Sequence, residues 1–517
     1  MADRKSRDRK QFVQLTLPFD EAVSCSPHKQ QPLDAQQIAR EIAKHPHIFV
    51  ALVQNTLTVA HSLRDNYFRN TAGLVSKLRE QLGTTNGAEP GTQPLFAIEA
   101  VDPKLGWDDL RGEEIAFIDG GIGSVEILSQ VPMLLRVGTY KVKTGETILS
   151  QREEFGFYPV IFGDLAGGSK ERKDYPDIVR IIAELLGVLH TLHRYPELDI
   201  LVLHGPLVYL MGQYAGHIPF TEGDMDTYLR NYSLDQDLKT EFQSEAEHIY
   251  PQMTGQWRSS YWLGRLEGQY EPICLIRFLL WKILQLATDE RRPKKTLICG
   301  VAERGTSSEF LRRFVFQKAF ERDRDFFNGI FGRKDINSAK AAVDRLGYND
   351  PLLLSMLLRS GEYSEPFDMD SKYREFRGAI GGTEVDDVRV DYTVFRPDGS
   401  FPFPRVSGFY LQVSDHTFPI RIEVFGDLAS RQVRDVAQRI YLYSTLLPGY
   451  AFPVGLDIAD KFAKVPQWLT DAYGKLIKYH LRTQLYEGRI TDEQMRRILI
   501  QALYLTQRDW LFRPIVR

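Results

Sequence analysis

The stretch Phe117-Ile118-Asp119-Gly120-Gly121 decides the fold, because it places a carboxylate at the end of a buried strand. The run Glu114–Asp119 is short and mostly apolar, and it stops at two glycines, as a strand at a sheet edge would. Glycines at such a place leave room for a ligand close to the backbone. Asp119 is therefore a candidate metal ligand. The alternative is an aspartate that only forms a turn before Gly-Gly, and the motif alone leaves both interpretations open.

The segments after this strand predict a mixed α/β sheet. Two strand-like runs lie within Ser124–Lys143 and another at Glu154–Phe162. A helix is expected from Asp174 to Leu192, with a proline in its first turn, and a buried strand at Asp199–Leu203. Antiparallel strands, a helix and a return strand are typical of such a sheet. Further along we expect a helix at Ile273–Ala287 and strands at Thr296–Val301, Val388–Val394 and within Phe409–Val424.

The chain divides by composition into four predicted parts. Residues 1–33 are rich in charge, Gln, Ser and Pro and are expected to be a disordered tail. Residues 34–90 form a helical N-terminal region that ends in a Gly-rich linker. Residues 110–465 form the α/β domain, with an insertion at about 211–265, and residues 466–517 form C-terminal helices.

Charge and cysteine content narrow the class of protein. The 517 residues carry 65 basic and 68 acidic side chains, so the net charge is −3. This balance weakens a histone-like or repressor-like interpretation and allows an enzyme with a locally basic groove. Cys25, Cys274 and Cys299 form no CxxC pair, which suggests a reducing compartment and argues against a zinc ribbon. No signal peptide or membrane-spanning segment is recognisable, so we expect a cytoplasmic protein that does not enter a membrane.

Glu184 and His204 are two further polar residues beside predicted buried elements. Glu184 lies off the apolar side of its helix and four residues after Arg180, so a solvated ion pair is the simpler interpretation from the residues alone. His204 ends a predicted strand just before Gly205-Pro206, as Asp119 does before two glycines. A neutral imidazole is a competent ligand for Mn²⁺ or Zn²⁺ and a poor one for Mg²⁺, although a lone histidine is more often structural.

The order of these and later motifs resembles the NurA nucleases, which act with the HerA ATPase translocase in DNA end processing. The resemblance covers roughly residues 110–465. Its elements are the strand at Asp119, the Arg180…Glu184 helix, Gly205-Pro206-Leu207, Leu297–Ala302, Asn349-Asp350-Pro351-Leu352-Leu353, Gly361-Glu362-Tyr363-Ser364, Ile420-Arg421-Ile422-Glu423 and Gly449–Val454.

The resemblance implies a fold and a chemistry. The fold would be a ribonuclease-H-like mixed sheet with helical additions at both ends. The chemistry would be phosphodiester hydrolysis of DNA with divalent metal, Mn²⁺ rather than Mg²⁺, held by Asp119, Glu184 and His204 as catalytic ligands. The family forms a homodimer that docks on a hexameric HerA-like ATPase, in DNA repair or phage defence. The sequence has no P-loop of its own, GxxxxGK[ST], so a motor would have to be a partner.

This chain departs from the family pattern at several positions. His204 stands where the third ligand is usually Asp, Phe452 and Asp460 where a Tyr and a His are usual, and Glu303 where a Lys is frequent. The site can be rearranged, with Asp460 or Glu303 as a substitute ligand, it can favour Mn²⁺ more strongly, or it can be inactive. We favour an active, rearranged site because the replacing groups still bind metal. The competing hypothesis is a non-catalytic adaptor subunit of a translocase complex.

Two further interaction sites are predicted. Arg304, Arg312 and Arg313 follow the strand that leads to Glu303, and they are candidates for gripping DNA phosphates. The peptide Gln14-Leu15-Thr16-Leu17-Pro18-Phe19 resembles motifs that dock into bacterial sliding clamps through residues equivalent to Gln14, Leu17 and Phe19. The alternative is an amphipathic tail that packs on its own domain.

Overall fold

The computed structural model describes most of the chain between residues 58 and 504. The longer described ranges are 58–83, 94–125, 133–162, 169–207, 272–303, 307–332, 336–369, 406–426 and 430–504. The proposed clamp peptide, Arg304 and nearly all of the expected insertion at 211–265 lie outside the described residues. The chain forms two compact units, Met1–Ala72 and Gly73–Arg517, and each is treated by itself. In the first unit the described part contains a π-helical turn at Leu63–Phe68 and the start of helix α3, Arg69–Glu80.

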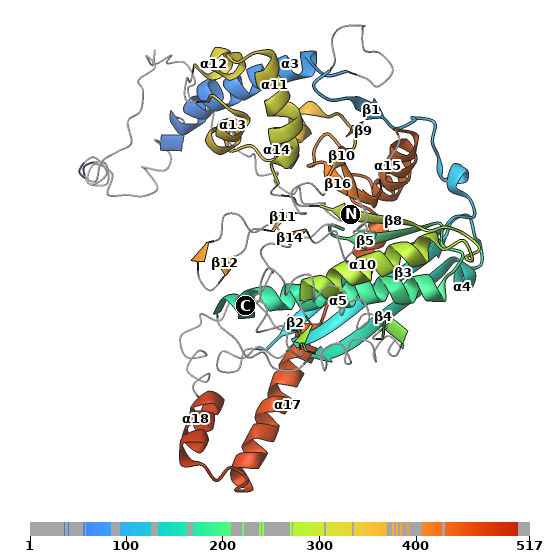
Figure 1. The fold of residues 1–517 in the computed structure, drawn as a ribbon, viewed down its shortest axis with the longest axis vertical. Coiled ribbons are helices and arrows are strands. Elements are labelled where there is room, and N and C mark those ends of the chain that lie inside the picture. The colour runs from blue at the N-terminus through green and yellow to red at the C-terminus, as the bar shows by residue number, and fades with distance from the viewer. Residues whose placement is uncertain are drawn as a thin grey trace, which may run out of the picture. The chain divides into compact units, whose positions relative to one another are not determined.

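The unit Gly73–Arg517 is built on one ten-stranded mixed sheet (Figure 1). Its strand order is β1-β9-β15-β16-β8-β5-β2-β3-β4, and β10 pairs with β15 beside this path. The strands are β1 (Ile98–Ala100), β2 (Glu114–Ser124), β3 (Met133–Lys143), β4 (Glu153–Phe162), β5 (Ile200–His204), β8 (Leu297–Ala302), β9 (Glu362–Ser364), β10 (Phe367–Asp368), β15 (Val406–Leu411) and β16 (Ile420–Phe425). Three two-stranded pairs stand apart: β6 (Phe220–Thr221) with β7 (Gln269–Tyr270), β11 (Glu375–Phe376) with β14 (Val390–Asp391), and β12 (Ala379–Ile380) with β13 (Thr383–Glu384).

The strands β4-β3-β2-β5-β8 form the ribonuclease-H-like core that the sequence predicts. β2, β3 and β4 are an antiparallel meander, whereas β5 runs parallel to β2 and β8 runs parallel to β5. Helix α5 (Ser169–Arg194) joins β4 to β5, and a parallel return of this kind needs such a crossover. The predicted mixed α/β fold is confirmed, with β2 longer than expected: it continues through Asp119 to Ser124.

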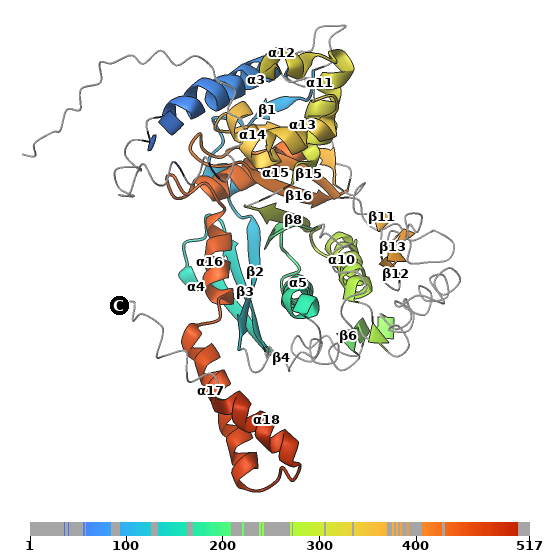
Figure 2. The ribbon, with the colours of Figure 1, turned by 90° about the vertical axis from the view of Figure 1, so that its left-hand side faces the viewer.

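Helices cover both faces of this core (Figure 2). On one face, α5 and α10 (Pro272–Thr288) pack against side chains such as Ile118 and Leu203. On the other face, α15 (Ser430–Thr445) and α16 (Val454–Ala463) pack against Phe117, Val202 and Val301. The sheet therefore carries apolar side chains on both faces, as expected for parallel strands enclosed by helices.

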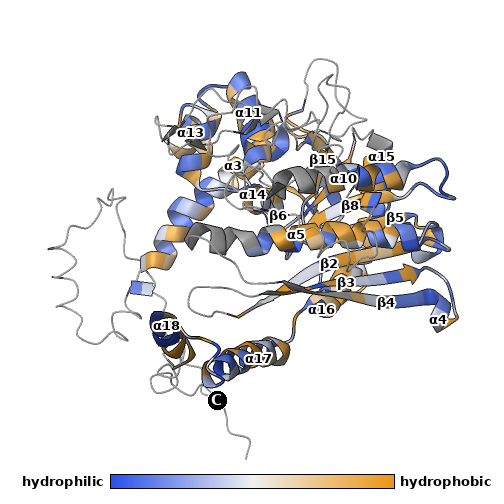
Figure 3. Cartoon of the chain, turned by 60° about the horizontal axis from the view of Figure 1, so that its bottom comes forward, coloured by the Kyte–Doolittle hydropathy of each residue, from blue (hydrophilic) through white to orange (hydrophobic). Residues whose placement is uncertain are grey.

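The remaining helices lie around the rest of the sheet or extend from it. They are a 3-10 turn at Trp107–Leu110, α4 (Leu149–Arg152), a π-helical turn at Leu311–Phe316, α11 (Gln317–Arg322), α12 (Phe326–Phe331), α13 (Ala339–Leu346), α14 (Asp350–Leu357), α17 (Gln467–Tyr486) and α18 (Glu493–Tyr504). The C-terminal part of α5 is largely hydrophobic in Figure 3, consistent with its burial between the sheet and α10. None of the helices in the described ranges has the length and apolar character needed to cross a bilayer.

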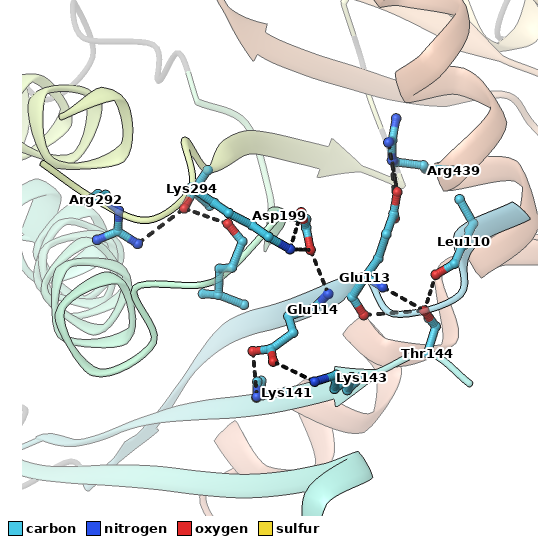
Figure 4. Close-up of polar contacts among 12 residues, drawn as sticks. Leu110, Glu113, Glu114, Lys141, Lys143, Thr144, Asp199, Arg292, Lys294 and Arg439 are labelled. Carbon is cyan, nitrogen blue, oxygen red and sulfur yellow. Dashed lines mark hydrogen bonds and ion pairs between the residues drawn. The ribbon is translucent and has the colours of Figure 1, made fainter. Parts of the chain in front are cut away.

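A polar network joins the amino-terminal ends of the central strands (Figure 4). The Asp199 carboxylate accepts a hydrogen bond from the backbone N–H of Glu114 at 2.9 Å. It also forms an ion pair with Lys294 at 3.0 Å. Lys141 Nζ lies 2.8 Å from the Glu114 carboxylate, and Lys143 Nζ lies 3.5 Å from it. These contacts hold β2, β5 and the approach to β8 in register, so the opposite strand ends are also held at fixed positions.

Candidate metal centre

Asp119 and His204 lie side by side where β5 ends, and β2 continues past Asp119 to Ser124. Ile118 pairs with Leu203 across β2 and β5, so the next residues, Asp119 and His204, are neighbours on the same face. Asp119 Oδ2 lies 2.8 Å from His204 Nδ1, and Asp119 Oδ1 accepts the backbone N–H of Gly120 at 2.7 Å. The aspartate is nearly buried and its orientation is fixed by both contacts.

Glu184 reaches the same place from α5, on the other side of the sheet. Its side chain occupies the space that a β-carbon on Gly120 would fill, and an ideal Cβ there would lie 2.8 Å from Glu184 Cδ. Gly120 therefore lets the glutamate pass the strand and approach Asp119. Glu184 is 1% exposed and forms an ion pair with Arg180. The ion pair suggested by the sequence exists, but the expected solvation is wrong, because α5 is enclosed by the sheet and by α10.

The protonation of these groups reflects their burial. Desolvation raises the pKa of Glu184 to about 7; the positive charge of Arg180 opposes this rise and the charge of Asp119 adds to it. For His204, burial works to lower the pKa, but the hydrogen bond and charge of Asp119 outweigh it, so the pKa is raised. A buried carboxyl group beside a second carboxylate is an arrangement that a cation would stabilise.

Helix α16 comes close to the sheet because glycines line its path. An ideal Cβ on Gly138, which pairs with Asp119 across β2 and β3, would lie 2.5 Å from the backbone nitrogen of Ala463. A Cβ on Gly121 would lie 2.7 Å from the carbonyl carbon of Ala463. The close approach brings Asp460, on the same helix, to the cavity that also contains Asp119.

One cavity of about 640 Å³ collects the candidate groups. It is lined by the predicted ligands Asp119, Glu184 and His204 and by the proposed substitutes Asp460 and Glu303. The tertiary structure therefore brings together five residues that the sequence distributes over more than 340 positions.

Sequence reasoning missed two polar groups on the cavity wall, Tyr450 and Asp457. Burial, followed by a hydrogen bond to Asp457, raises the pKa of Tyr450 to about 12. The position at which the family tyrosine is expected holds Phe452, which also lines the cavity. A tyrosine two residues earlier in the same Gly449–Val454 segment was the signal that could have identified Tyr450.

The buried acid Glu423 positions the loop that follows His204. Glu423, on β16, accepts the backbone N–H of Leu207 at 2.8 Å and the Nε–H of Arg421 at 2.8 Å. An ideal Cβ on Gly300 would lie 2.7 Å from the carbonyl oxygen of Gly205, so a glycine is needed where β8 passes this loop. The segments 205–207 and 420–423 are thus joined by the hydrogen bond between Leu207 and Glu423.

The chemical types of the donor groups suit a divalent cation. Carboxylates and an imidazole are the donors that Mn²⁺ accepts, and they converge from β2, α5, β5 and α16. Their present partners are protein groups, His204 for Asp119 and Arg180 for Glu184. Within the described residues, no group of three His, Cys, Asp or Glu side chains is arranged to hold a metal ion. Binding would therefore require the two pairs to open.

The remaining predicted residues lie elsewhere. Arg312 pairs with Glu309 at 2.7 Å, and Arg313 donates to the carbonyl oxygen of Asp368 at 3.3 Å. Neither arginine lines the cavity. Arg304 and the clamp-peptide residues Gln14, Leu17 and Phe19 fall outside the described residues, so all of these roles stay predictions.

Comparisons with solved structures return several NurA proteins. The NurA nuclease from Sulfolobus solfataricus is 11% identical, with 87% of this chain and 98% of that chain covered and a TM-score of 0.43. NurA with manganese is 9% identical, with 82% of this chain and 98% of that chain covered and a TM-score of 0.36. NurA bound to dAMP and manganese is 8% identical, with 84% of this chain and 94% of that chain covered and a TM-score of 0.31.

The sequence comparisons give a more direct result. A search of curated proteins finds no match. The family model described as the NurA domain matches residues 113–465, which include every element of the candidate centre. The chain therefore belongs to the NurA family.

Proposed function

We propose that this chain is a divalent-metal-dependent nuclease that hydrolyses phosphodiester bonds of DNA in the cavity at Asp119. The observation that carries the proposal is the meeting of Asp119, Glu184 and His204, from three separate elements, in one cavity of a NurA-family domain. Two relatives were crystallised with manganese, and we extend this metal to the present chain as Mn²⁺. The imidazole of His204 favours Mn²⁺ over Mg²⁺.

Each residue would have a separate task. Asp119 is held by the Gly120 N–H at one oxygen, which leaves the oxygen that now faces His204 to bind the ion. Glu184 would supply a second carboxylate once it is deprotonated, and His204 a neutral nitrogen. Asp460 or Glu303 would complete the set. When bound, the metal would supply an activated water and neutralise charge on the phosphate.

Arg180 is the basic side chain that lines this cavity in the described residues. In the present structure it pairs with Glu184 and lies 3.9 Å from Asp177. If Glu184 turned to a cation, the guanidinium would lose that partner and could meet a substrate phosphate in the same cavity. A guanidinium matches the geometry of phosphate oxygens. We therefore assign Arg180 to substrate phosphate binding in the proposed reaction.

The decisive test is an assay of the full chain on single- and double-stranded DNA with Mn²⁺, in the presence and absence of a HerA-like ATPase. We expect cleavage that Asp119→Ala abolishes and that Glu290→Gln, an exposed acid outside the cavity, leaves unchanged. No cleavage with any divalent metal would reject the proposed activity.

Calorimetric titration with Mn²⁺ separates the candidate fourth ligands. We expect Asp119→Asn to remove binding and either Asp460→Asn or Glu303→Gln to weaken it by at least tenfold. The variant that weakens binding identifies the substitute carboxylate. Unchanged affinity in both would reject a rearranged ligand set.

The adaptor function is the second candidate, because Asp119 and Glu184 are each satisfied by a protein partner. In that case the pairs would be structural and the full chain would bind no Mn²⁺. The same titration therefore distinguishes the adaptor from the enzyme.

We further propose that the chain works as a homodimer with a hexameric HerA-like ATPase, on DNA ends in cytoplasmic repair or phage defence. Family membership and the lack of a P-loop in the sequence support this arrangement. Light scattering should give twice the chain mass of 59.4 kDa, and a tagged ATPase should retain the chain. A monomer that the ATPase does not retain would reject the assembly.

A further inference from the structure

A second cavity, of about 390 Å³, lies on the α16 side of the sheet and is mostly apolar. Its walls come from the 3-10 turn at Trp107–Leu110, from β2 and β3, from the end of α15 and from the start of α16. The volume is within the range of small-molecule sites, which typically combine apolar walls with a few polar groups. None of the proposed metal ligands lines this cavity.

Aromatic rings form the walls of this second cavity. Trp107 stacks on Tyr443 with centroids 6.1 Å apart and ring planes inclined by 30°. Tyr443 meets the edge of Phe117 at 5.7 Å, and Phe117 stacks on Tyr140 at 6.0 Å. Trp107 remains 40% exposed, so part of its ring is open to a planar ligand. Bases stack on such rings with little dependence on sequence.

The rim of the cavity carries more positive than negative groups. Arg111, Lys143 and Arg152 line it, together with Asp108 and Glu153. Arg152 pairs with Glu153 at 2.8 Å, and Lys143 lies 3.5 Å from Glu114. Arg111 lies against the turn at Gly145, where an ideal Cβ would be 2.8 Å from its Cγ. Three cations around an apolar cavity complement a ligand with a flat apolar part and an anionic part.

One polar atom of a wall residue is buried beneath the cavity surface and lacks a partner within the described residues. The Tyr443 hydroxyl is buried and makes no hydrogen bond. Burial raises its pKa well above the ordinary value, so the hydroxyl keeps its proton at neutral pH and can donate. A buried polar group without a partner is uncommon in folded proteins and costs stability. The hydroxyl has almost no accessible surface, so it does not reach a ligand in the cavity, and Tyr443 contributes its ring to the wall.

We propose that this cavity binds a nucleotide, with the base against Trp107 and the phosphate at Arg111, Lys143 and Arg152. The site goes beyond the proposed nuclease activity and does not require it. Its chemistry suits both a free nucleotide and a nucleotide within a DNA strand.

The cavity is placed to communicate with the metal centre through β2 and α16. Phe117, on the cavity wall, lies two residues before Asp119 on the same face of β2, about 7 Å along the strand. An ideal Cβ on Gly455 would lie 2.5 Å from Phe117 Cγ, so α16 rests directly on this ring. A base bound here would contact the same helix that carries Asp460.

The test is calorimetric titration of the full chain with dAMP in EDTA, so that no metal contributes to binding. We expect saturable binding to the wild type. Trp107→Ala should weaken it roughly 5- to 150-fold, the range of one base–aromatic stack, and Trp107→Phe should weaken it less. Trp468→Ala, a tryptophan 69% exposed on α17, is the matched control and should bind dAMP as the wild type does.

Tyr443→Phe provides a second measurement, because it removes only the hydroxyl. It should bind dAMP as the wild type does, because the ring that lines the cavity is kept, while the melting temperature of the ligand-free variant stays equal or rises, because an unsatisfied hydroxyl is removed. A several-fold loss of dAMP affinity in this variant would overturn this placement of the ring.

Further ligands distinguish the source of the nucleotide and challenge the proposal. Binding of dAMP without binding of an oligodeoxyadenylate would assign the site to free nucleotides, and binding of both would assign it to a DNA strand. Equal affinity for 2-deoxyribose 5-phosphate would overturn the proposal, because no base would be needed. Loss of binding in Asp119→Ala would overturn it too, because the nucleotide would then occupy the metal centre.

Discussion

The side chain of Glu184 lies where a β-carbon on Gly120 would be. This contact explains why the residue after Asp119 is a glycine. With a larger residue there, Glu184, which comes from the helix on one face of the sheet, could not approach Asp119, which points to the opposite face. The Asp-Gly-Gly motif is therefore a packing requirement as well as a ligand position.

Gly120→Ala should separate Glu184 from Asp119. The new methyl group would displace the glutamate, because its Cγ and Cδ atoms occupy that space. We expect Mn²⁺ affinity and Mn²⁺-dependent cleavage to fall at least tenfold, measured by calorimetry and by DNA cleavage, with loss of roughly 1–3 kcal/mol of stability. Gly106→Ala is the control, since nothing lies within 4 Å of a Cβ there. Equal Mn²⁺ affinities in the two variants would contradict this account.

Glu184→Gln should stabilise the metal-free protein above neutral pH. The folded-state pKa of Glu184 is raised from 4.5 to about 7, so the folded state favours the protonated form. The associated stability is fully present below pH 4.5 and is lost as the pH rises through 7. The full loss is on the order of 3 kcal/mol.

Urea unfolding in EDTA, compared at pH 5 and pH 8, checks the role of Glu184. The wild type should lose stability between these values, and Glu184→Gln should lose less. If the free energy of unfolding changed equally with pH in the two proteins, the carboxyl group of Glu184 would not be the cause of the pH dependence.

His204→Asp should change the metal preference of the proposed enzyme. A carboxylate in place of the imidazole offers the hard oxygen that Mg²⁺ requires. The ratio of Mg²⁺- to Mn²⁺-supported cleavage should therefore rise, by roughly tenfold. The variant should also unfold more easily without metal, because its new carboxylate would face Asp119, whose Oδ2 now lies 2.8 Å from the ring nitrogen. An unchanged metal ratio would argue that His204 does not touch the ion.

Glu423→Gln should destabilise the fold and disturb the loop after His204. The Arg421–Glu423 pair is buried, with side-chain exposures of 10% and 0%. Removing the Glu423 charge takes a charged partner from a buried guanidinium, at a cost of roughly 3–5 kcal/mol in unfolding free energy. The control is the pair Arg489–Glu487, whose side chains are 72% and 45% exposed. Glu487→Gln should lower the unfolding free energy by less than about 1 kcal/mol. Similar costs in urea unfolding would contradict the buried role.

Local patterns determined the elements of the fold. The helix expected at Ile273–Ala287 is Pro272–Thr288, and the strand expected at Thr296–Val301 is Leu297–Ala302. Periodicity and proline or glycine punctuation depend on neighbours in the chain, so the sequence expresses them directly. The strand predicted at Val388–Val394 is described only as Val390–Asp391. The predicted boundaries of the four parts of the chain stay predictions.

The sequence by itself also placed His204 at a strand end, because the apolar run of that strand stops there, but it was wrong about Asp119, since β2 continues to Ser124. It could not show that Glu184 is buried or that Tyr450 and Asp457 share the cavity. Those outcomes depend on how closely α5 and α16 approach the sheet. That distance is set by the space left at Gly120, Gly121 and Gly138. Only the tertiary structure decided this, because the space beside a glycine is defined by atoms that lie far away in the chain.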